Sequence, residues 1–214
     1  HQLRDALHRV EDEGRLAVLV ALLARRAGRP VRLEYSRGEE FVAGRNRQEA
    51  HMRLKVGVQA DGTPTAIQLH ATMNAGAFVA SGMNVTRRVG QGALYLYTCP
   101  NARFEGMTVY TNRPAGGSFR GLGAPLGHFA LEVTIDQICA ALGVDPLDYR
   151  LQHHVTRAGQ PGQRRTPPDQ ILPDEPVEGG VPFSSNELRE CLLAGAKRIG
   201  WRQRRQPNAT ATGV

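Results

Sequence analysis

The feature that most constrains the fold of this chain is a glycine-rich segment between an apolar run and a helical pattern. Residues 116–123 read Gly-Gly-Ser-Phe-Arg-Gly-Leu-Gly, with Arg120 as their only charged residue. Glycine is needed where a backbone turns sharply or approaches another group more closely than a Cβ allows. An arginine among such glycines can present its guanidinium or its backbone N–H to an anionic or oxo group. The segment therefore predicts a ligand-binding loop, although an ordinary strand-to-helix connection has the same pattern.

Two nucleotide-binding motifs do not match this loop. The spacing of Gly121, Gly123 and Gly127 departs from G-x-G-x-x-G, and Pro125 interrupts the run. The chain contains no G-x-x-x-x-G-K-[ST] sequence, which excludes a phosphate-cradling P-loop. A ligand of this loop would therefore be held in a different way.

The first part of the chain predicts a helix and a short strand. Residues 16–24 are apolar on all sides and too few to cross a bilayer, so we expect a buried helix there. Arg25-Arg26, Gly28 and Pro30 mark its end. Residues 31–35 are then expected to form a short strand.

A β-hairpin is predicted after this region. Apolar and polar residues alternate over 52–59 and again over 65–72, which is the pattern of half-buried strands. Asp61-Gly62 between them is a common hairpin turn. We expect Ile67 and Leu69 of the second strand to face inward.

A strand at 107–111 is predicted to lead into the loop, and a helix over 126–142 to follow it. Gly143 would end that helix, and Asp145-Pro146 would start a short second one with an N-cap and a proline in the first turn. The residues expected to pack the long helix against the core are Leu126, Phe129, Ala130, Val133, Ile138 and Leu142.

The charge of the chain does not indicate a nucleic-acid partner. The formal net charge is +7, and Lys55 and Lys197 are the only lysines. The arginines form no obvious stripe, aromatic residues are sparse at 6%, and no nucleic-acid-binding module is visible. We therefore expect an arginine-rich surface or a subunit contact. No apolar run approaches the length of a membrane span, so none is expected.

The three cysteines do not form a metal-binding pattern. Cys99, Cys139 and Cys191 are far apart and none belongs to a C-x-x-C pair, so zinc and iron–sulfur ligation have no local support. Cys139 and Cys191 lie on apolar helix faces and are interpreted as core thiols.

The sequence around the loop resembles a known enzyme family. Residues 110–125 read Tyr-Thr-Asn-Arg-Pro-Ala-Gly-Gly-Ser-Phe-Arg-Gly-Leu-Gly-Ala-Pro. Members of the xanthine dehydrogenase and aldehyde oxidase family carry an F-R-G-F-G-[GA]-P-Q loop after a strand ending in T-N, in their molybdenum-cofactor-binding subunit. Residues 26–33, 140–150 and 182–191 resemble further segments of that subunit, in the same order.

The resemblance implies an α/β (α+β) fold with mixed sheets and packed helices, as part of the molybdenum-cofactor-binding domain. Residues 1–155 would be the C-terminal part of a first subdomain. Residues 156–182, rich in proline, glycine and charge, would be a linker without a packed core of its own. Residues 183–214 would begin a second subdomain, so the chain is expected to be a middle fragment.

The resemblance also implies a molybdenum hydroxylase that oxidises an aldehyde or an N-heterocycle, with water as the source of oxygen. Its cofactor would be molybdopterin or the cytosine dinucleotide form. Iron–sulfur clusters and FAD would be held on partner domains or subunits. A cytoplasmic location is expected, with a periplasmic one left open.

Five residues are assigned to the site by position in the family motif. Arg120, Gly121 and Phe119 would contact the cofactor, with Arg120 near molybdenum but not a ligand through its side chain. Phe119 is expected to pack inward. Leu122 stands where a substrate-stacking phenylalanine is usual, and Arg88 aligns with a substrate-orienting arginine.

Some parts of the family pattern are absent from this chain. The upstream G-G-F-G-G loop and a glutamine-containing cofactor segment are not found. The family's base glutamate would lie beyond Val214, so no catalytic residue is assigned here. The sequence therefore leaves a second hypothesis open, a non-catalytic relict or interaction module on the same scaffold, without cofactor.

Overall fold

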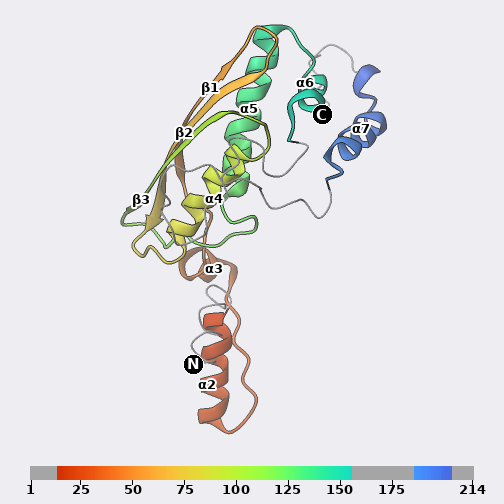
Figure 1. The fold of residues 1–214 in the computed structure, drawn as a ribbon. Helices are drawn as coiled ribbons and strands as arrows, with labels where there is room; N and C mark the ends of the chain where they lie inside the picture. Colours follow the sequence, from red (N-terminus) through yellow and green to blue (C-terminus); the bar gives the residue numbers. More distant parts are fainter. Residues whose placement is uncertain (1–13, 156–185, 204–214) are drawn as a thin grey trace. The chain divides into compact units, whose positions relative to one another are not determined.

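The computed structural model describes residues 14–155 and 186–203 (Figure 1). These residues form helices and one three-stranded sheet, and the chain divides into two compact units. The first unit contains Gln68–Leu94, Arg103–Val133 and the described residues up to Lys55. The second contains Val56–Ile67, Tyr95–Ala102 and the described residues from Thr134 onward.

The predicted hairpin is confirmed. Strand β1, Ala50–Val58, is followed by β2, Pro64–Gly76. The Gln59 N–H donates to the Thr63 carbonyl at 2.9 Å to close the turn, and Gly62 takes a φ of +88° that an L-residue rarely adopts. Ile67 and Leu69 are buried as expected, because alternate β2 side chains face the core.

The third strand makes the sheet mixed, as predicted. Strand β3, Asn101–Tyr110, begins earlier than its sequence pattern indicated and pairs with β2 in the order β1-β2-β3. Its two ends meet the corresponding ends of β2. The Asn101 side chain donates to the Thr65 carbonyl at 2.8 Å, and the Thr111 N–H donates to the Gly76 carbonyl at 3.0 Å. β3 is therefore parallel to β2, and the chain between them crosses over through helix α4, Gly82–Leu94.

The core of the first unit lies between β2 and α4. Alternate β2 residues meet α4 residues spaced one helical turn apart, and α4 lies beside the sheet in Figure 1. Sequence patterning did not predict α4, because its apolar positions are few and separated by polar residues and glycine. The fully buried cluster consists of Leu69, Ala71, Met73, Val85, Val89 and Ala93.

The helix after the loop is confirmed, but its buried face was predicted incorrectly. Helix α5 spans Ala124–Leu142, and Gly143 ends it with a φ of +69°. Phe129 and Val133, expected in the core, are 68% and 42% exposed. The buried residues repeat every four positions instead, at Leu131, Ile135 and Cys139. The helix is apolar around most of its circumference, so periodicity alone could not select the packed face.

The second unit is organised by a capped short helix. Helix α6, Pro146–His153, starts as predicted with Asp145 at the N-cap, which accepts from the Leu147 and Asp148 N–H groups. Asp145 also accepts from the Trp201 indole N–H at 3.1 Å. Trp201 is the first residue of the short 3₁₀ helix η1, Trp201–Gln203, which follows helix α7, Leu188–Arg198.

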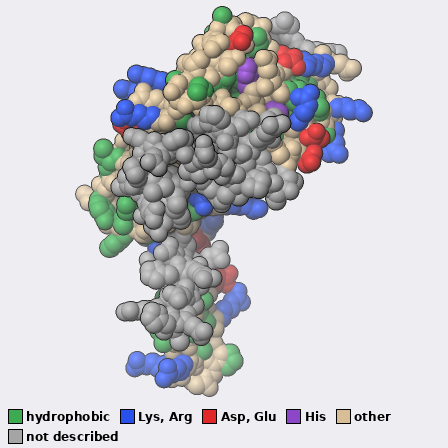
Figure 2. All heavy atoms as spheres, in the orientation of Figure 1, with side chains coloured by type: hydrophobic (Ala, Val, Ile, Leu, Met, Phe, Trp, Pro, Cys, Tyr) green, Lys and Arg blue, Asp and Glu red, His purple; other side chains and the backbone are tan. Residues whose placement is uncertain are grey.

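Two predictions for the first part of the chain are wrong. Helix α2, Gly14–Ala27, forms, but its apolar side chains are exposed, with Leu22 at 56%. Figure 2 shows hydrophobic and basic side chains together at the surface around this helix. Residues 31–35 form no strand, and the chain continues to helix α3, Arg37–Ala43, which begins with a capping box between Ser36 and Glu39.

The cysteines divide between buried and exposed positions. Cys139 is fully buried, as predicted for a core thiol, whereas Cys191 is exposed, so that prediction is wrong. No helix within residues 14–155 or 186–203 is long and apolar enough to cross a bilayer. The linker predicted at 156–182 lies outside the described residues.

Tyr149 gives the second unit a testable dependence on pH. Its side chain is 3% exposed, and its hydroxyl donates to the Gly62 carbonyl at 3.0 Å, which fastens α6 to the hairpin turn. Burial raises the pKa of Tyr149 from 10.0 to about 12, because the phenolate is poorly solvated there.

We expect the unit to lose stability as the pH rises from 10 towards 12. The folded state keeps the Tyr149 proton in that window while the unfolded state loses it, so the free energy of unfolding falls by up to about 1.4 kcal/mol per pH unit. Tyr149→Phe should remove most of this slope, measured by urea unfolding at pH 8 and pH 11. An equal slope in the variant would contradict the assignment.

Candidate functional site

The glycine-rich loop joins β3 to α5 through three consecutive left-handed residues. Gly121, Leu122 and Gly123 have φ values of +86°, +45° and +85°. A Cβ on Gly123 would lie 2.3 Å from the Val85 carbonyl oxygen of α4, so only glycine fits this approach. The Leu122 N–H donates to the Phe119 carbonyl at 2.7 Å, which closes a tight turn. The predicted bend at the strand-to-helix junction is confirmed.

A short upstream segment, residues 45–48, forms a bed under the first half of the loop. Asn46 pairs with Gly116 in a parallel bridge, and its carbonyl accepts from the Gly117 N–H at 3.2 Å. A Cβ on Gly116 would lie 2.4 Å from Gln48 Cγ, and one on Gly117 would lie 2.9 Å from Arg45 Cδ. Gly116 is therefore required for the loop to lie directly on the bed, whereas the flexible Arg45 side chain could shift to admit a Cβ at Gly117.

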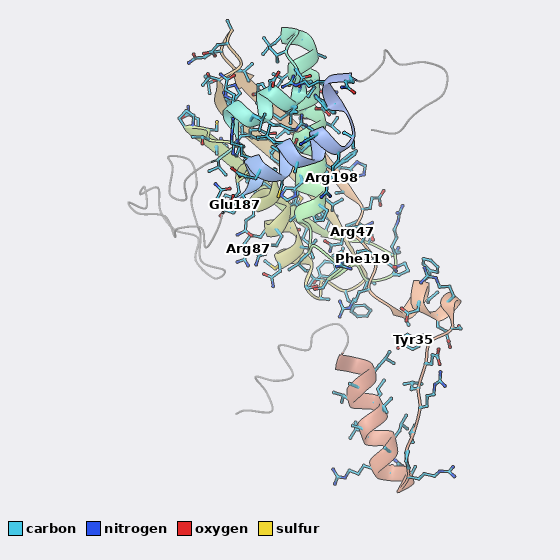
Figure 3. All side chains as sticks on the ribbon, turned by 90° about the vertical axis from the view of Figure 1, so that its right-hand side faces the viewer. Tyr35, Arg47, Arg87, Phe119, Glu187 and Arg198 are labelled. Carbon is cyan, nitrogen blue, oxygen red and sulfur yellow. The ribbon has the colours of Figure 1, made fainter. Side chains whose placement is uncertain are left out.

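Arg47 in the bed contacts the two central residues of the loop. Its Nη2 donates to the Arg120 carbonyl at 2.7 Å, and its guanidinium lies over the Phe119 ring, with Cζ 4.7 Å from the ring centroid. Figure 3 shows Arg47 and Phe119 side by side. Phe119 was expected to pack inward, but it is 50% exposed, so that expectation is wrong. The ring stacks on a cation instead of entering the core, an arrangement aromatic rings favour electrostatically.

Arg120 presents unused hydrogen-bond donors. Its side chain is exposed, and within the described parts of the chain its guanidinium has no hydrogen-bond or ion-pair partner. No described residue accepts from the backbone N–H groups of Arg120, Gly121 or Gly123. Successive N–H groups in left-handed and turn conformations form concave sites for anions and oxo groups. The loop therefore combines backbone donors with a planar guanidinium that no described residue binds.

The two residues assigned to substrate contact lie in different surroundings. Leu122 is half-buried and packs against the core cluster of the first unit. Arg88 is exposed on α4, three residues after Val85, the residue that Gly123 approaches. The interactions of the described residues include no contact between Arg88 and the loop. Their roles toward a substrate remain predictions.

The loop region fits a group that offers oxygen atoms to hydrogen-bond donors. Gln48, 3% exposed beneath Gly116, has no hydrogen-bond partner for either amide atom among the described residues. Buried polar groups are usually paired, so such an amide is expected where a further group completes its hydrogen bonds. No group of three or more His, Cys, Asp or Glu side chains in residues 14–155 and 186–203 could hold a metal ion. The donors of the loop thus suit contact with a cofactor's oxygen atoms.

The bed was missed by sequence analysis. Its side chains Arg45, Arg47 and Gln48 come from a polar stretch with no motif of its own, and Arg47 is 73 residues from the carbonyl that it binds. The only sequence signal is the Gly116-Gly117 pair, which indicates a close approach without naming the partner.

Comparison with known proteins identifies relatives of this chain. A family model described as "Molybdopterin cofactor-binding domain" matches residues 12–153. The xanthine dehydrogenase molybdenum-binding subunit of Escherichia coli O157:H7 is 34% identical over 86% of this chain and 22% of its own length. The nicotinate dehydrogenase large molybdopterin subunit of Eubacterium barkeri is 34% identical over 61% of this chain and 31% of its own.

A solved structure shows the same fold. The aldehyde oxidoreductase of Desulfovibrio gigas superposes with a TM-score of 0.67 at 30% sequence identity, over 90% of this chain and 20% of that one. This chain therefore spans about a fifth of the length of the aldehyde oxidoreductase and of the xanthine dehydrogenase subunit.

Proposed function

Because the chain belongs to the molybdopterin cofactor-binding domain family, we propose that it supplies one cofactor-contacting wall of a molybdenum hydroxylase. The proposed enzyme oxidises an aldehyde or an N-heterocycle with water as the source of oxygen. The observation that carries this proposal is the loop at 116–123. Its left-handed glycines lie on one short turn with amides and an Arg120 guanidinium that no described residue binds.

The cofactor, when bound, supplies the redox chemistry that adds a hydroxyl group to carbon. The chain's own residues bind and orient it. The Arg120 guanidinium and the N–H groups of Gly121 and Gly123 would donate to its oxygen atoms, and the fixed backbone would hold those donors ready before the ligand arrives. Phe119 would limit solvent access beside them. Proton removal is assigned to a glutamate from another segment.

The proposed substrate class is supported by the relatives' names and by two side chains. Relatives of this chain are described as acting on xanthine, nicotinate or aldehydes. Leu122 keeps an apolar wall but cannot stack on an aromatic ring as phenylalanine does. Arg88 would orient a polar substituent. We infer that iron–sulfur and flavin domains or subunits accept the electrons, as the resemblance implies.

The proposal predicts molybdenum in the full-length protein and isotope transfer from water. We expect near-stoichiometric molybdenum by elemental mass spectrometry, and oxygen-18 from labelled water in the acid or hydroxylated product. The 214-residue chain alone should retain no molybdenum, because a cofactor of this size draws donors from several segments. A full-length protein without molybdenum would contradict the proposal and favour a non-catalytic scaffold. Oxygen taken from O₂ would contradict the hydroxylase chemistry.

A further inference from the structure

We propose that Arg47 is a positioning residue that holds the central peptide of the glycine-rich loop in its donor-presenting conformation. It binds the loop twice, through a hydrogen bond to the Arg120 carbonyl and through stacking on the Phe119 ring. No other described side chain forms a hydrogen bond, ion pair or ring contact with either of these two residues. The hydrogen bond holds the Arg120–Gly121 peptide by its carbonyl, and the ring contact holds the preceding residue, Phe119.

The loop needs such a restraint because its own backbone is permissive. Gly121 and Gly123 flank Leu122, and glycine has many accessible conformations when it is unrestrained. The Arg120 side chain has no partner that would hold it in place within the described residues. Without a contact at the Arg120 carbonyl, the Arg120–Gly121 peptide could rotate, and the Gly121 N–H would turn with it.

Arginine suits this role better than lysine. Its planar guanidinium can donate along its edge while its face stacks on an aromatic ring, and both contacts are made here by one group. The bed also places the guanidinium accurately, because Asn46 next to it pairs with Gly116. A lysine could still donate to the carbonyl, but its compact ammonium has no planar face that could lie over the ring at the same time.

Hydrogen exchange in the full-length protein tests the proposal without relying on activity. We expect Arg47→Met to raise the exchange rate of the Leu122 amide about tenfold. The Leu122 N–H donates to the Phe119 carbonyl, and that turn should open more often once the charged hydrogen bond to the neighbouring Arg120 carbonyl is lost. Arg47→Lys should give an intermediate rise. Arg53→Met, at an exposed arginine of β1, is the matched control and should leave the loop unchanged. The single variant Phe119→Leu should also raise the exchange rate. In the double variant with Arg47→Met, it should add little to the increase caused by Arg47→Met.

A second readout separates positioning from general stability. In the molybdenum-loaded protein, Arg47→Met should lower kcat per molybdenum by a larger factor than it raises KM. The melting temperature of the protein should not change. This readout rests on the proposed function, whereas hydrogen exchange does not. If the wild-type protein contains no molybdenum, the proposed function is contradicted. The exchange data would still decide whether Arg47 positions the loop. Unchanged loop exchange in Arg47→Met, or equal protection in Arg47→Met and Arg47→Lys, would overturn the positioning role.

Discussion

Gly123→Ala is expected to destabilise the first unit by roughly 2–5 kcal/mol, through two additive costs. The residue has a φ of +85°, and a Cβ there would lie 2.3 Å from the Val85 carbonyl oxygen. The first cost is backbone strain, and the second is displacement of α4 from the loop. Because α4 carries half of the buried cluster, the displacement would open the core.

Two other glycines provide matched controls for this variant. Gly143 has a φ of +69° but nothing within 4 Å of the added Cβ, so Gly143→Ala should cost only the strain, about 1–2 kcal/mol. Gly195, inside α7, has neither a positive φ nor an atom within 4 Å of the added Cβ. Gly195→Ala should therefore stabilise its helix by about 0.5–1 kcal/mol. Urea unfolding of the three variants gives the order of their changes in the free energy of unfolding. A Gly123→Ala cost no larger than that of Gly143→Ala would contradict the close approach of loop and α4.

Elements specified by local signals could be predicted from the sequence. The Asp61-Gly62 turn and the Asp145 cap need only a few neighbouring residues, and both occur where their motifs indicated. The glycine-rich loop belongs to this class as well. Its glycines at 121 and 123 require particular φ values that few other residues adopt.

Features that depend on distant partners could not be predicted. Helix α5 is apolar around most of its surface, so Phe129 and Leu131 were equally plausible core residues until the packing was known. Helix α2 fits the pattern of a buried helix, yet Leu22 is 56% exposed among the residues that the structure describes. The inward prediction for Phe119 failed for the same reason, because its stacking partner Arg47 lies 72 positions earlier in the numbering.

The second large effect is expected at Arg120. Arg120→Ala in the full-length enzyme should lower turnover tenfold or more, which is typical of losing an electrostatic contact near the reacting group. Arg120→Lys should restore little of the turnover, because an ammonium cannot reproduce the planar, two-pronged arrangement of donors in the guanidinium. Stability should change little, since the side chain has no partner within the described residues. Arg53→Ala serves as the control for loss of an exposed arginine.

The measurement that tests the account most directly is turnover per bound molybdenum in wild-type and Arg120→Ala protein, with the metal quantified in the same samples. Dividing by molybdenum content separates a direct effect on the reaction from a loss of cofactor or of folded protein. We predict that folded Arg120→Ala protein with bound molybdenum turns over at a tenth of the wild-type rate or less. Equal turnover per molybdenum in the two proteins would remove Arg120 from the site and contradict the assignment of this loop to the cofactor.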